Sequence, residues 1–295
     1  MLPTMASSLS SDLFFNAMGK SFAKTFRPLT FLLAFVFFHS GLSLEAQTMP
    51  TERHSSTFGI GLSREYDSYL SPISYTGAAI SFDNEVWKQS RLFADDVYKQ
   101  TYFAGRFGDL QNEAGNGAAM DGYFDASSAL LFRFFRQGGL ELFAGPELML
   151  EMGGVYNMRN SNNPAQVKLD ADLGASFQAA WNFSLLARMW RLSWQSDVPL
   201  MGFFFSPSYQ KSYYEIFYLG HTDGILHAST PFNSFSSRHF LRLDVQNRKG
   251  FLRLQCSYGL SQWHAAGNSY RNDAFSISVG YVHFLQFLTP NQTDL

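Results

Sequence analysis

Residues 167–181 read VKLDADLGASFQAAW, and every odd-numbered position from Val167 to Trp181 is apolar. The positions between them include Lys168, Asp170 and Asp172. Successive side chains of a strand point to opposite faces, so this stretch has an apolar face and a charged face. It exceeds the average strand of about 5–6 residues and is long enough to cross a bilayer, which takes about 9–11. An apolar exterior around a charged interior is typical of an outer-membrane β-barrel.

The composition agrees with a membrane barrel. The 295 residues include 31 Phe and 14 Tyr, and only 16% are charged, against about 25% in an average globular domain. In the body of the chain no apolar run approaches the ~20 residues of a membrane helix, which indicates that lipid-facing residues are interleaved with polar ones. The net charge of −2 offers no basic surface for nucleic acid, so that class of partner is excluded.

The amino terminus predicts export. In residues 1–47 three basic residues precede the short apolar stretch LTFLLAFVFF at 29–38, and small residues follow. This is the pattern of a cleaved signal peptide, with Met18 as an alternative start. Export to the outer membrane of a Gram-negative envelope makes periplasmic chaperones, the barrel-assembly machinery and outer-membrane lipid the expected partners. Cys256 is the only cysteine, so no intramolecular disulfide is expected.

Further strands follow from the same alternation. They are predicted at 56–64, 73–83, 99–110, 122–136, 141–152, 167–181, 186–196, 212–219, 225–230, 238–245, 251–260 and 273–286. Tight turns containing Gly or Asn alternate with longer polar loops, as in barrels with short periplasmic turns and long outer loops. The sequence therefore predicts an all-β, antiparallel up-and-down barrel of about twelve strands over residues 48–287, with a tail at 288–295. Ten strands is the alternative, because the inner connection at 84–98 is too long for the pattern.

Two stretches resemble a known family. They are PLMGFFFSPSYQKSYYEIFYL at 199–219 and FSISVGYV at 275–282, together with Asn163–Pro164. They resemble a family of uncharacterised outer-membrane proteins from Bacteroidetes, filed as a domain of unknown function, over roughly residues 55–287. The resemblance implies a barrel at the cell surface and brings no activity or catalytic residue. The chain departs from many outer-membrane proteins in that LTPNQTDL follows Phe287, whereas such chains often end on an aromatic residue.

The charged faces of the predicted strands point into the lumen. Charges of both signs are nearly balanced, and isolated buried charges are costly, so a network of ion pairs that plugs the lumen is the leading interpretation. A charged lining for a small polar solute is the alternative. The residues of this network are Arg133, Glu141, Glu147, Glu151, Lys168, Asp170, Asp172, Arg191, Asp197, Glu215, Arg238, Arg242, Asp244 and Arg253.

An enzymatic hypothesis rests on His227 and Ser229. Outer-membrane phospholipases and lipid A deacylases also place a His and a Ser two residues apart on one strand face, where the imidazole can take the serine proton. Those enzymes follow the serine with Asn, whereas Thr230 follows here. A lipid esterase using His227 and Ser229 is therefore the alternative function, and a non-enzymatic barrel is preferred.

A third hypothesis is surface recognition by the predicted loop 197–211. It contains Phe203, Phe204, Phe205 and Tyr209, a high aromatic density for a loop in water, and exposed aromatic clusters mark contact sites. The preferred interpretation is that the loop folds inward as a lid or that its start extends the membrane strand. No metal or redox cofactor is predicted. The sequence thus predicts an outer-membrane barrel that serves structure, narrow-pore passage of small polar solutes, or surface binding.

Overall fold

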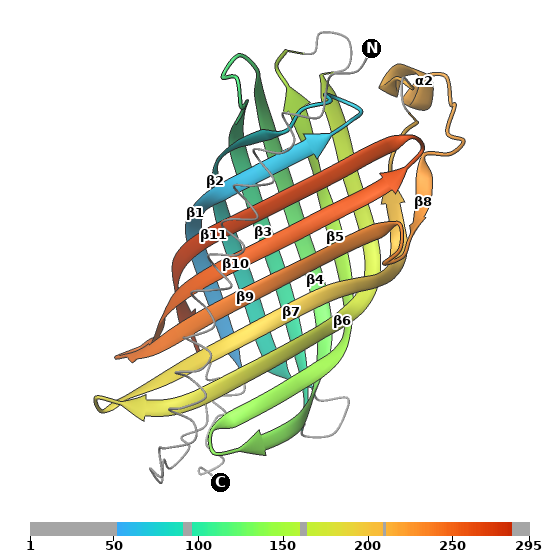
Figure 1. Cartoon of the computed structure of the whole chain (residues 1–295). Coiled ribbons are helices and arrows are strands. Elements are labelled where there is room, and N and C mark those ends of the chain that lie inside the picture. Colours follow the sequence, from blue (N-terminus) through green and yellow to red (C-terminus); the bar gives the residue numbers. More distant parts are fainter. Residues whose placement is uncertain (1–51, 91–95, 160–163, 209–210, 285–295) are drawn as a thin grey trace, which may run out of the picture. The chain divides into compact units, whose positions relative to one another are not determined.

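The computed structural model describes residues 52–90, 96–159, 164–208 and 211–284. These form an antiparallel β-barrel within the compact unit Ala46–Leu295 (Figure 1). The predicted signal peptide at 1–47, the tail at 288–295 and Tyr209 lie outside the described residues. Among the described residues, no helix has the length and apolar character needed to span a membrane.

Ten long strands close the barrel. Each pairs with its antiparallel neighbours in the order β6-β5-β4-β3-β2-β1-β11-β10-β9-β7, and the pairing of β6 with β7 completes the ring. The strands are β1 (Arg53–Asp67), β2 (Tyr75–Gln89), β3 (Val97–Asn112), β4 (Ala118–Gln137), β5 (Leu140–Asn157), β6 (Ala165–Leu185), β7 (Arg188–Phe205), β9 (Ser234–Asn247), β10 (Gly250–Ala265) and β11 (Asn268–His283). A short extra strand, β8 (Leu226–Ser229), pairs with the end of β7.

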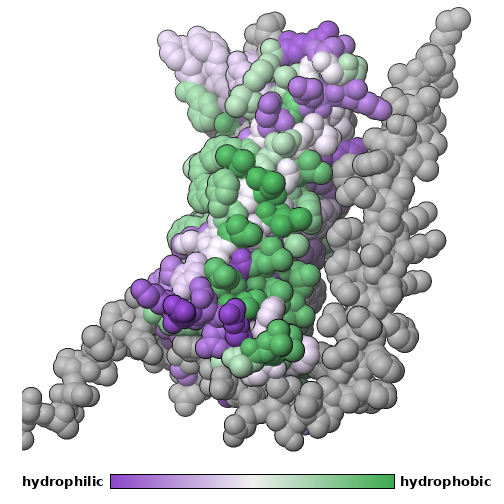
Figure 2. Space-filling model, turned by 90° about the vertical axis from the view of Figure 1, so that its left-hand side faces the viewer, coloured by the Kyte–Doolittle hydropathy of each residue, from purple (hydrophilic) through white to green (hydrophobic). Residues whose placement is uncertain are grey.

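The alternation predicted from residues 167–181 orients β6 as expected. Lys168 is only 2% exposed and lies in the lumen, whereas Leu169 and Leu173 are 41% and 54% exposed on the outer wall. Similar apolar side chains cover the outward faces of the other long strands, and Figure 2 shows them as a hydrophobic band on one side of the barrel. Such a wall is suited to lipid rather than water. The predicted all-β barrel is confirmed.

The strand number is the predicted alternative of ten, not twelve. Residues 212–219 form helix α2 (Tyr213–Phe217) instead of a strand, because Ser212 and Glu215 make a reciprocal capping box at its start. Residues 226–229 form β8, which pairs with four residues of β7 and does not span the wall. Both corrections fall in the segment between β7 and β9, where aromatic residues mimic a strand pattern.

Two predicted connections are shorter than expected. β2 continues to Gln89 and β3 begins at Val97, so residues 84–89 and 97–98 of the proposed inner connection at 84–98 are strand. β7 continues to Phe205, so the first part of the predicted loop 197–211 is also strand. Short turns at Gln137–Leu140, Leu185–Arg188 and Asn247–Gly250 lie at the end where β1 begins, and the segment that carries α2 lies at the other (Figure 1). We call these the turn end and the loop end.

Candidate functional site

Apolar side chains fill the lumen at the turn end. Trp87, Tyr98, Leu131 and Phe143 belong to one buried cluster. The ring centroid of Phe143 lies 5.4 Å from that of Trp87 and 5.5 Å from that of Tyr98, both in edge-on contacts. These residues come from four consecutive strands and all point inward. They form one apolar layer in the lumen, and we call them the lower seal.

A second aromatic cluster fills the loop end. Trp263 stacks between Phe204 and Tyr270, with both centroid distances at 5.2 Å. A neighbouring buried cluster adds Leu110, Val155 and further side chains under the loop that follows β1. Phe204, Trp263 and Tyr270 are called the upper seal. The ion pairs of Arg253 with Glu85 and of Arg238 with Glu147 lie between these two seals, whereas Glu141 lies on the turn side of Phe143.

Arg253 organises the charged layer next to the lower seal. Its guanidinium donates two hydrogen bonds to Asp244, at 2.7 and 2.9 Å, and one to Glu85 Oε2 at 2.6 Å. Arg242 donates to Gln255 Oε1 at 2.9 Å and to Gln195 Oε1 at 2.8 Å. Bidentate arginine–carboxylate contacts are among the strongest hydrogen bonds in proteins. This layer is therefore a paired network.

Other ion pairs occupy the remaining depth of the lumen. Arg238 Nη2 lies 2.9 Å from Glu147 Oε1 and 3.6 Å from Asp197 Oδ2. Arg191 and Arg133 both reach Glu141, with N–O distances of 3.2 and 3.0 Å. Opposite charges thus meet across the lumen, as paired buried charges require.

Lys168 and Asp67 form an ion pair beside the upper seal. The Lys168 Nζ lies 2.6 Å from Asp67 Oδ2, and both side chains are 2% exposed. Nζ also donates to Gln166 Oε1 at 2.7 Å and lies 3.9 Å from the ring centroid of Tyr270. The ammonium is held by a carboxylate, an amide oxygen and an aromatic face, so its charge is well satisfied.

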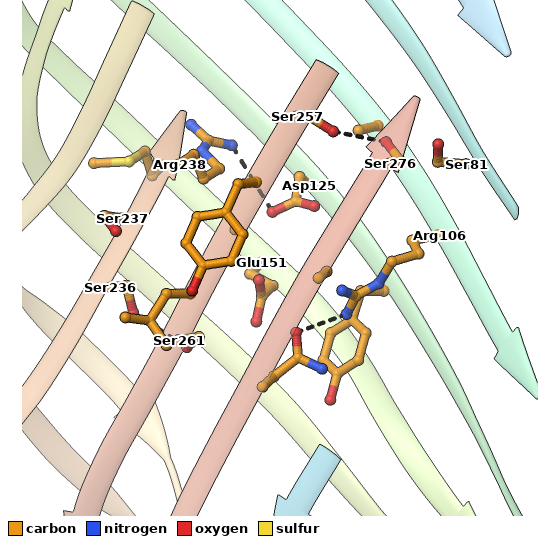
Figure 3. A pocket seen from close by; sticks show the side chains of 18 of the residues that line it. Ser81, Arg106, Asp125, Glu151, Ser236, Ser237, Arg238, Ser257, Ser261 and Ser276 are labelled. Atoms are coloured by element: carbon orange, nitrogen blue, oxygen red, sulfur yellow. Dashed lines mark hydrogen bonds and ion pairs between the residues drawn. The ribbon is translucent and has the colours of Figure 1, made fainter. Parts of the chain in front are cut away.

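A cavity of about 140 Å³ remains in the middle of the lumen. Asp125, Glu151 and Asp170 form a row along one side of it, because they lie directly opposite one another on β4, β5 and β6. Figure 3 shows Arg238 pointing toward Asp125, and their N–O distance is 3.8 Å. Arg106 is the second arginine of the lining. The cavity lining contains more carboxylates than arginines, so it is suited to a cationic group.

The structure places all but one of the predicted network residues in the lumen. The exception is Glu215, which lies on α2, where its carboxylate accepts a hydrogen bond from the Ser212 backbone N–H at 2.7 Å. The prediction failed there because a capping box was interpreted as a strand.

Sequence reasoning missed several lumen charges. Arg53, Glu65, Asp67, Asp83, Glu85, Arg106, Asp121 and Asp125 all point inward and were not predicted. The signal was present in the sequence, since Asp83, Glu85 and the seal residue Trp87 alternate along β2. It was lost because β2 was predicted to end at residue 83.

His227 and Ser229 share the inward face of β8, as predicted, but they are engaged elsewhere. His227 Nε2 lies 3.0 Å from the carbonyl oxygen of Ser206, and its ring lies over Phe204. Ser229 is 4% exposed and its side chain hydrogen-bonds Asp172. The imidazole contacts a backbone carbonyl instead of the serine hydroxyl, so this geometry does not activate Ser229 for attack on an ester.

The three phenylalanines of the predicted contact loop have different environments. Phe203 lies on the outer wall and is 57% exposed, whereas Phe204 and Phe205 are buried. Phe204 belongs to the upper seal, and Phe205 packs against Tyr213, with 6.5 Å between ring centroids. They therefore do not form one exposed aromatic patch, and surface contact stays a prediction for Phe203 and for Tyr209, which lies outside the described residues.

Metal binding has no support in the part of the chain that the structure describes. Within it, no group of three or more His, Cys, Asp and Glu side chains is arranged to hold a metal ion.

An apolar outer wall around a charged lumen defines an outer-membrane-type β-barrel. The chain belongs to the family described as "Protein of unknown function (DUF3316)", which matches residues 29–292. The predicted relationship to an uncharacterised family is thereby confirmed. No curated protein matches the sequence.

Solved structures with a similar fold are membrane barrels of low sequence identity. The transport unit of the autotransporter AIDA-I from Escherichia coli is 11% identical, with 84% of this chain and 94% of that chain covered and a TM-score of 0.42. The outer-membrane protease OmpT from Escherichia coli is 7% identical, with 82% and 99% covered and a TM-score of 0.44. The translocator domain of the autotransporter NalP from Neisseria meningitidis is 9% identical, with 89% and 97% covered and a TM-score of 0.38.

Proposed function

We propose that this protein is a closed, non-enzymatic outer-membrane barrel that acts through its outer surfaces and conducts no solute through its lumen. The observation that carries the proposal is the pair of aromatic seals at two levels of the lumen, with the ion pairs of Arg253 with Glu85 and of Arg238 with Glu147 between them. The lower seal is centred on Phe143 and the upper seal on Trp263. A ten-stranded barrel is also narrower than the 16–18 strands that leave an aqueous channel in porins.

Planar-bilayer conductance of the refolded full chain tests the closed lumen. We expect no single-channel steps under conditions where an open porin conducts. Phe143→Ala and Trp263→Ala should each stay silent, because the other seal and the ion pairs between the seals are intact. Steady steps from the unmodified protein that shift with Glu147→Gln would instead establish an open, charged lumen.

The same preparation tests the esterase alternative. We expect no release of fatty acid from phospholipid, with or without calcium, because His227 contacts the Ser206 carbonyl and not Ser229. Release that is abolished by Ser229→Ala would overturn the non-enzymatic assignment.

Capture of a small cationic solute in the cavity is a second candidate role. Among the described residues, Glu151 Oε1 and Asp172 Oδ1 are buried without a hydrogen-bond partner. Together with the acidic row, they would accept hydrogen bonds from an ammonium group. Titration calorimetry with ethanolamine tests this role, since Glu151→Gln should weaken any binding. The absence of binding to the unmodified barrel would remove the candidate.

We further propose that residues 1–47 direct export and are removed, and that the barrel resides in the outer membrane. The basic residues and the short apolar stretch of this segment support export and cleavage. The apolar outer wall supports residence in the outer membrane. Mass spectrometry of the protein isolated from outer membranes tests both. A chain that retains its first 47 residues would contradict cleavage.

A further inference from the structure

Three charged residues interrupt the outer wall close to the loop end. Arg64 on β1 lies directly opposite Asp273 on β11, and Arg271 lies two residues before Asp273 on the same outward face. The next outward residues toward the turn end are Leu62 on β1 and Phe275 on β11, followed on β11 by Ile277, and all three are apolar. Leu62 is 52% and Ile277 47% exposed. The charges therefore lie at the border of the apolar wall, and we call them the wall cluster.

The wall cluster has a defined internal geometry. Arg271 donates to both carboxylate oxygens of Asp273, from Nε at 2.7 Å and from Nη2 at 3.1 Å. The hydroxyl of Tyr258 on β10 donates to Asp273 Oδ1 at 3.0 Å. Bidentate pairing fixes the plane of a guanidinium. Arg271 is thus held in one orientation by a carboxylate that itself has a second donor.

The Asp273 carboxylate and the Arg271 guanidinium differ in their exposure to the surroundings. Asp273 is only 5% exposed although it belongs to the outward face, whereas the Arg271 side chain is 51% exposed. The negative group is covered and a positive group faces the surroundings. Arg64 adds a second guanidinium, so the wall cluster contains two guanidiniums and one carboxylate.

The position of the wall cluster along the barrel axis indicates which part of the membrane surrounds it. Short turns face the periplasm in outer-membrane barrels and longer loops face outward, so the loop end corresponds to the outer leaflet. Charged residues at membrane depth are costly and are found where they have a function. A cationic group just above the apolar wall lies at the level of the lipid headgroups of that leaflet.

We propose that the wall cluster binds the phosphorylated headgroup of an outer-leaflet lipid. Arg271 and Arg64 supply the planar donors that recognise phosphate oxygens. Asp273 and Tyr258 act as positioning residues that hold Arg271 toward the lipid. The inference goes beyond the closed barrel, because it concerns the outer wall and holds whether or not the lumen conducts.

Native mass spectrometry of the refolded full chain in detergent tests the proposal. The probes are bisphosphorylated lipid A and the same lipid with its phosphates removed, each titrated against the barrel. We expect retention of the phosphorylated lipid only. Arg64→Gln combined with Arg271→Gln should weaken retention at least about tenfold, since charge-assisted hydrogen bonds are lost. The matched control is Arg248→Gln combined with Lys249→Gln in the turn between β9 and β10 at the turn end, which should bind normally.

Two further measurements distinguish lipid binding from binding of a simple anion and from loss of folding. Millimolar inorganic phosphate should not displace the lipid, because the acyl chains also contact the apolar wall; complete displacement would identify a simple anion site and contradict lipid recognition. Asp273→Asn keeps both arginines but loses the bidentate contact to a carboxylate, so retention should fall while heat-resistant electrophoretic mobility still reports a folded barrel. Equal retention by the double arginine variant and the unmodified protein would overturn the proposal.

Discussion

The ion pair between Lys168 and Asp67 gives the sharpest test of a structural lumen. At the N–O distance of 2.6 Å, the attraction is about 6 kcal/mol at an effective dielectric constant of ~20. Most of this offsets the removal of both ions from water, but Lys168→Met would leave Asp67 as an unpaired buried carboxylate. Breaking a buried pair in this way costs about 3–5 kcal/mol. Loss of the cation–π contact with Tyr270, at 3.9 Å, adds to the destabilisation.

The double variant Lys168→Met, Asp67→Asn separates the charge effect from packing. Removing both charges abolishes the unpaired carboxylate, and the Asn oxygen can still accept the bond that Asp67 Oδ1 receives from the Tyr69 N–H, at 3.0 Å. We expect its free energy of unfolding to return to within about 1 kcal/mol of the parent. The assay is reversible urea unfolding in lipid vesicles, followed by tryptophan fluorescence and electrophoretic mobility. A Lys168→Met barrel as stable as the parent, or a double variant no better than the single one, would refute the reasoning.

Three other outcomes follow from local structure. Gly145→Ala should lower the stability by about 1–3 kcal/mol in the same urea assay, because the added Cβ would overlap the carbonyl oxygen of Leu130. Ser212→Ala should cost α2 about 1 kcal/mol, seen as faster hydrogen exchange in residues 213–217 with the barrel amides unchanged. Hydrogen bonds from the Ser212 backbone N–H and hydroxyl lower the pKa of Glu215. The cap should therefore stabilise α2 above the ordinary glutamate pKa and be lost as the pH falls through the lowered value, a dependence of the exchange rates that Glu215→Gln should abolish.

The faces of the long strands could be predicted because a barrel repeats one local rule. Side-chain alternation assigns each residue of a strand to lipid or lumen independently of the rest of the fold. Phe240, for example, interrupts the charged face of Arg238 and Arg242, and it nevertheless points inward, where its ring contacts Tyr102 at a centroid distance of 5.3 Å.

The partners of the lumen charges could be predicted only between neighbouring strands. Arg253 and Asp244 lie opposite each other in one hairpin, so their bond follows from the turn between them. The bond of Arg253 to Glu85 joins residues 168 positions apart. It depends on how the ring closes, which alternation along single strands does not determine. In the upper seal, Trp263 and Tyr270 likewise lie opposite each other in one hairpin. The contact of Phe204 with Trp263 joins the non-neighbouring strands β7 and β10, so it could not be predicted from a single hairpin.

Residues 212–219 were predicted as a strand but contain helix α2, which shows that a helix-capping signal can outweigh strand propensity. Tyr213, Ile216 and Phe217 are residues that favour strands, and the segment lies where a barrel would place its next crossing. Ser212 and Glu215, however, have the S-x-x-E spacing that satisfies the first amides of a helix. Ile216 then becomes the buried residue of α2, at 1% exposure. A capping spacing within an aromatic run is therefore a better predictor than the run itself.

The wall of the barrel is interrupted between β8 and β9. This interruption lies in the segment where the strand number was wrongly predicted, and it borders the charged lumen. On this side of β7, pairing with β9 stops at Asp197 and pairing with β8 begins at Gly202. Pro199 lies in the interval and has no amide hydrogen to donate to a neighbouring strand. Unpaired backbone at membrane depth is tolerated where it lines a water-filled cavity, and Pro199 lines the central cavity together with Ser236 on β9. An apolar lumen would leave this part of the wall without polar partners. The acidic cavity therefore provides the polar surroundings that the interrupted part of the wall requires. Replacing the cavity charges by apolar residues should destabilise the β7–β9 junction before the rest of the barrel.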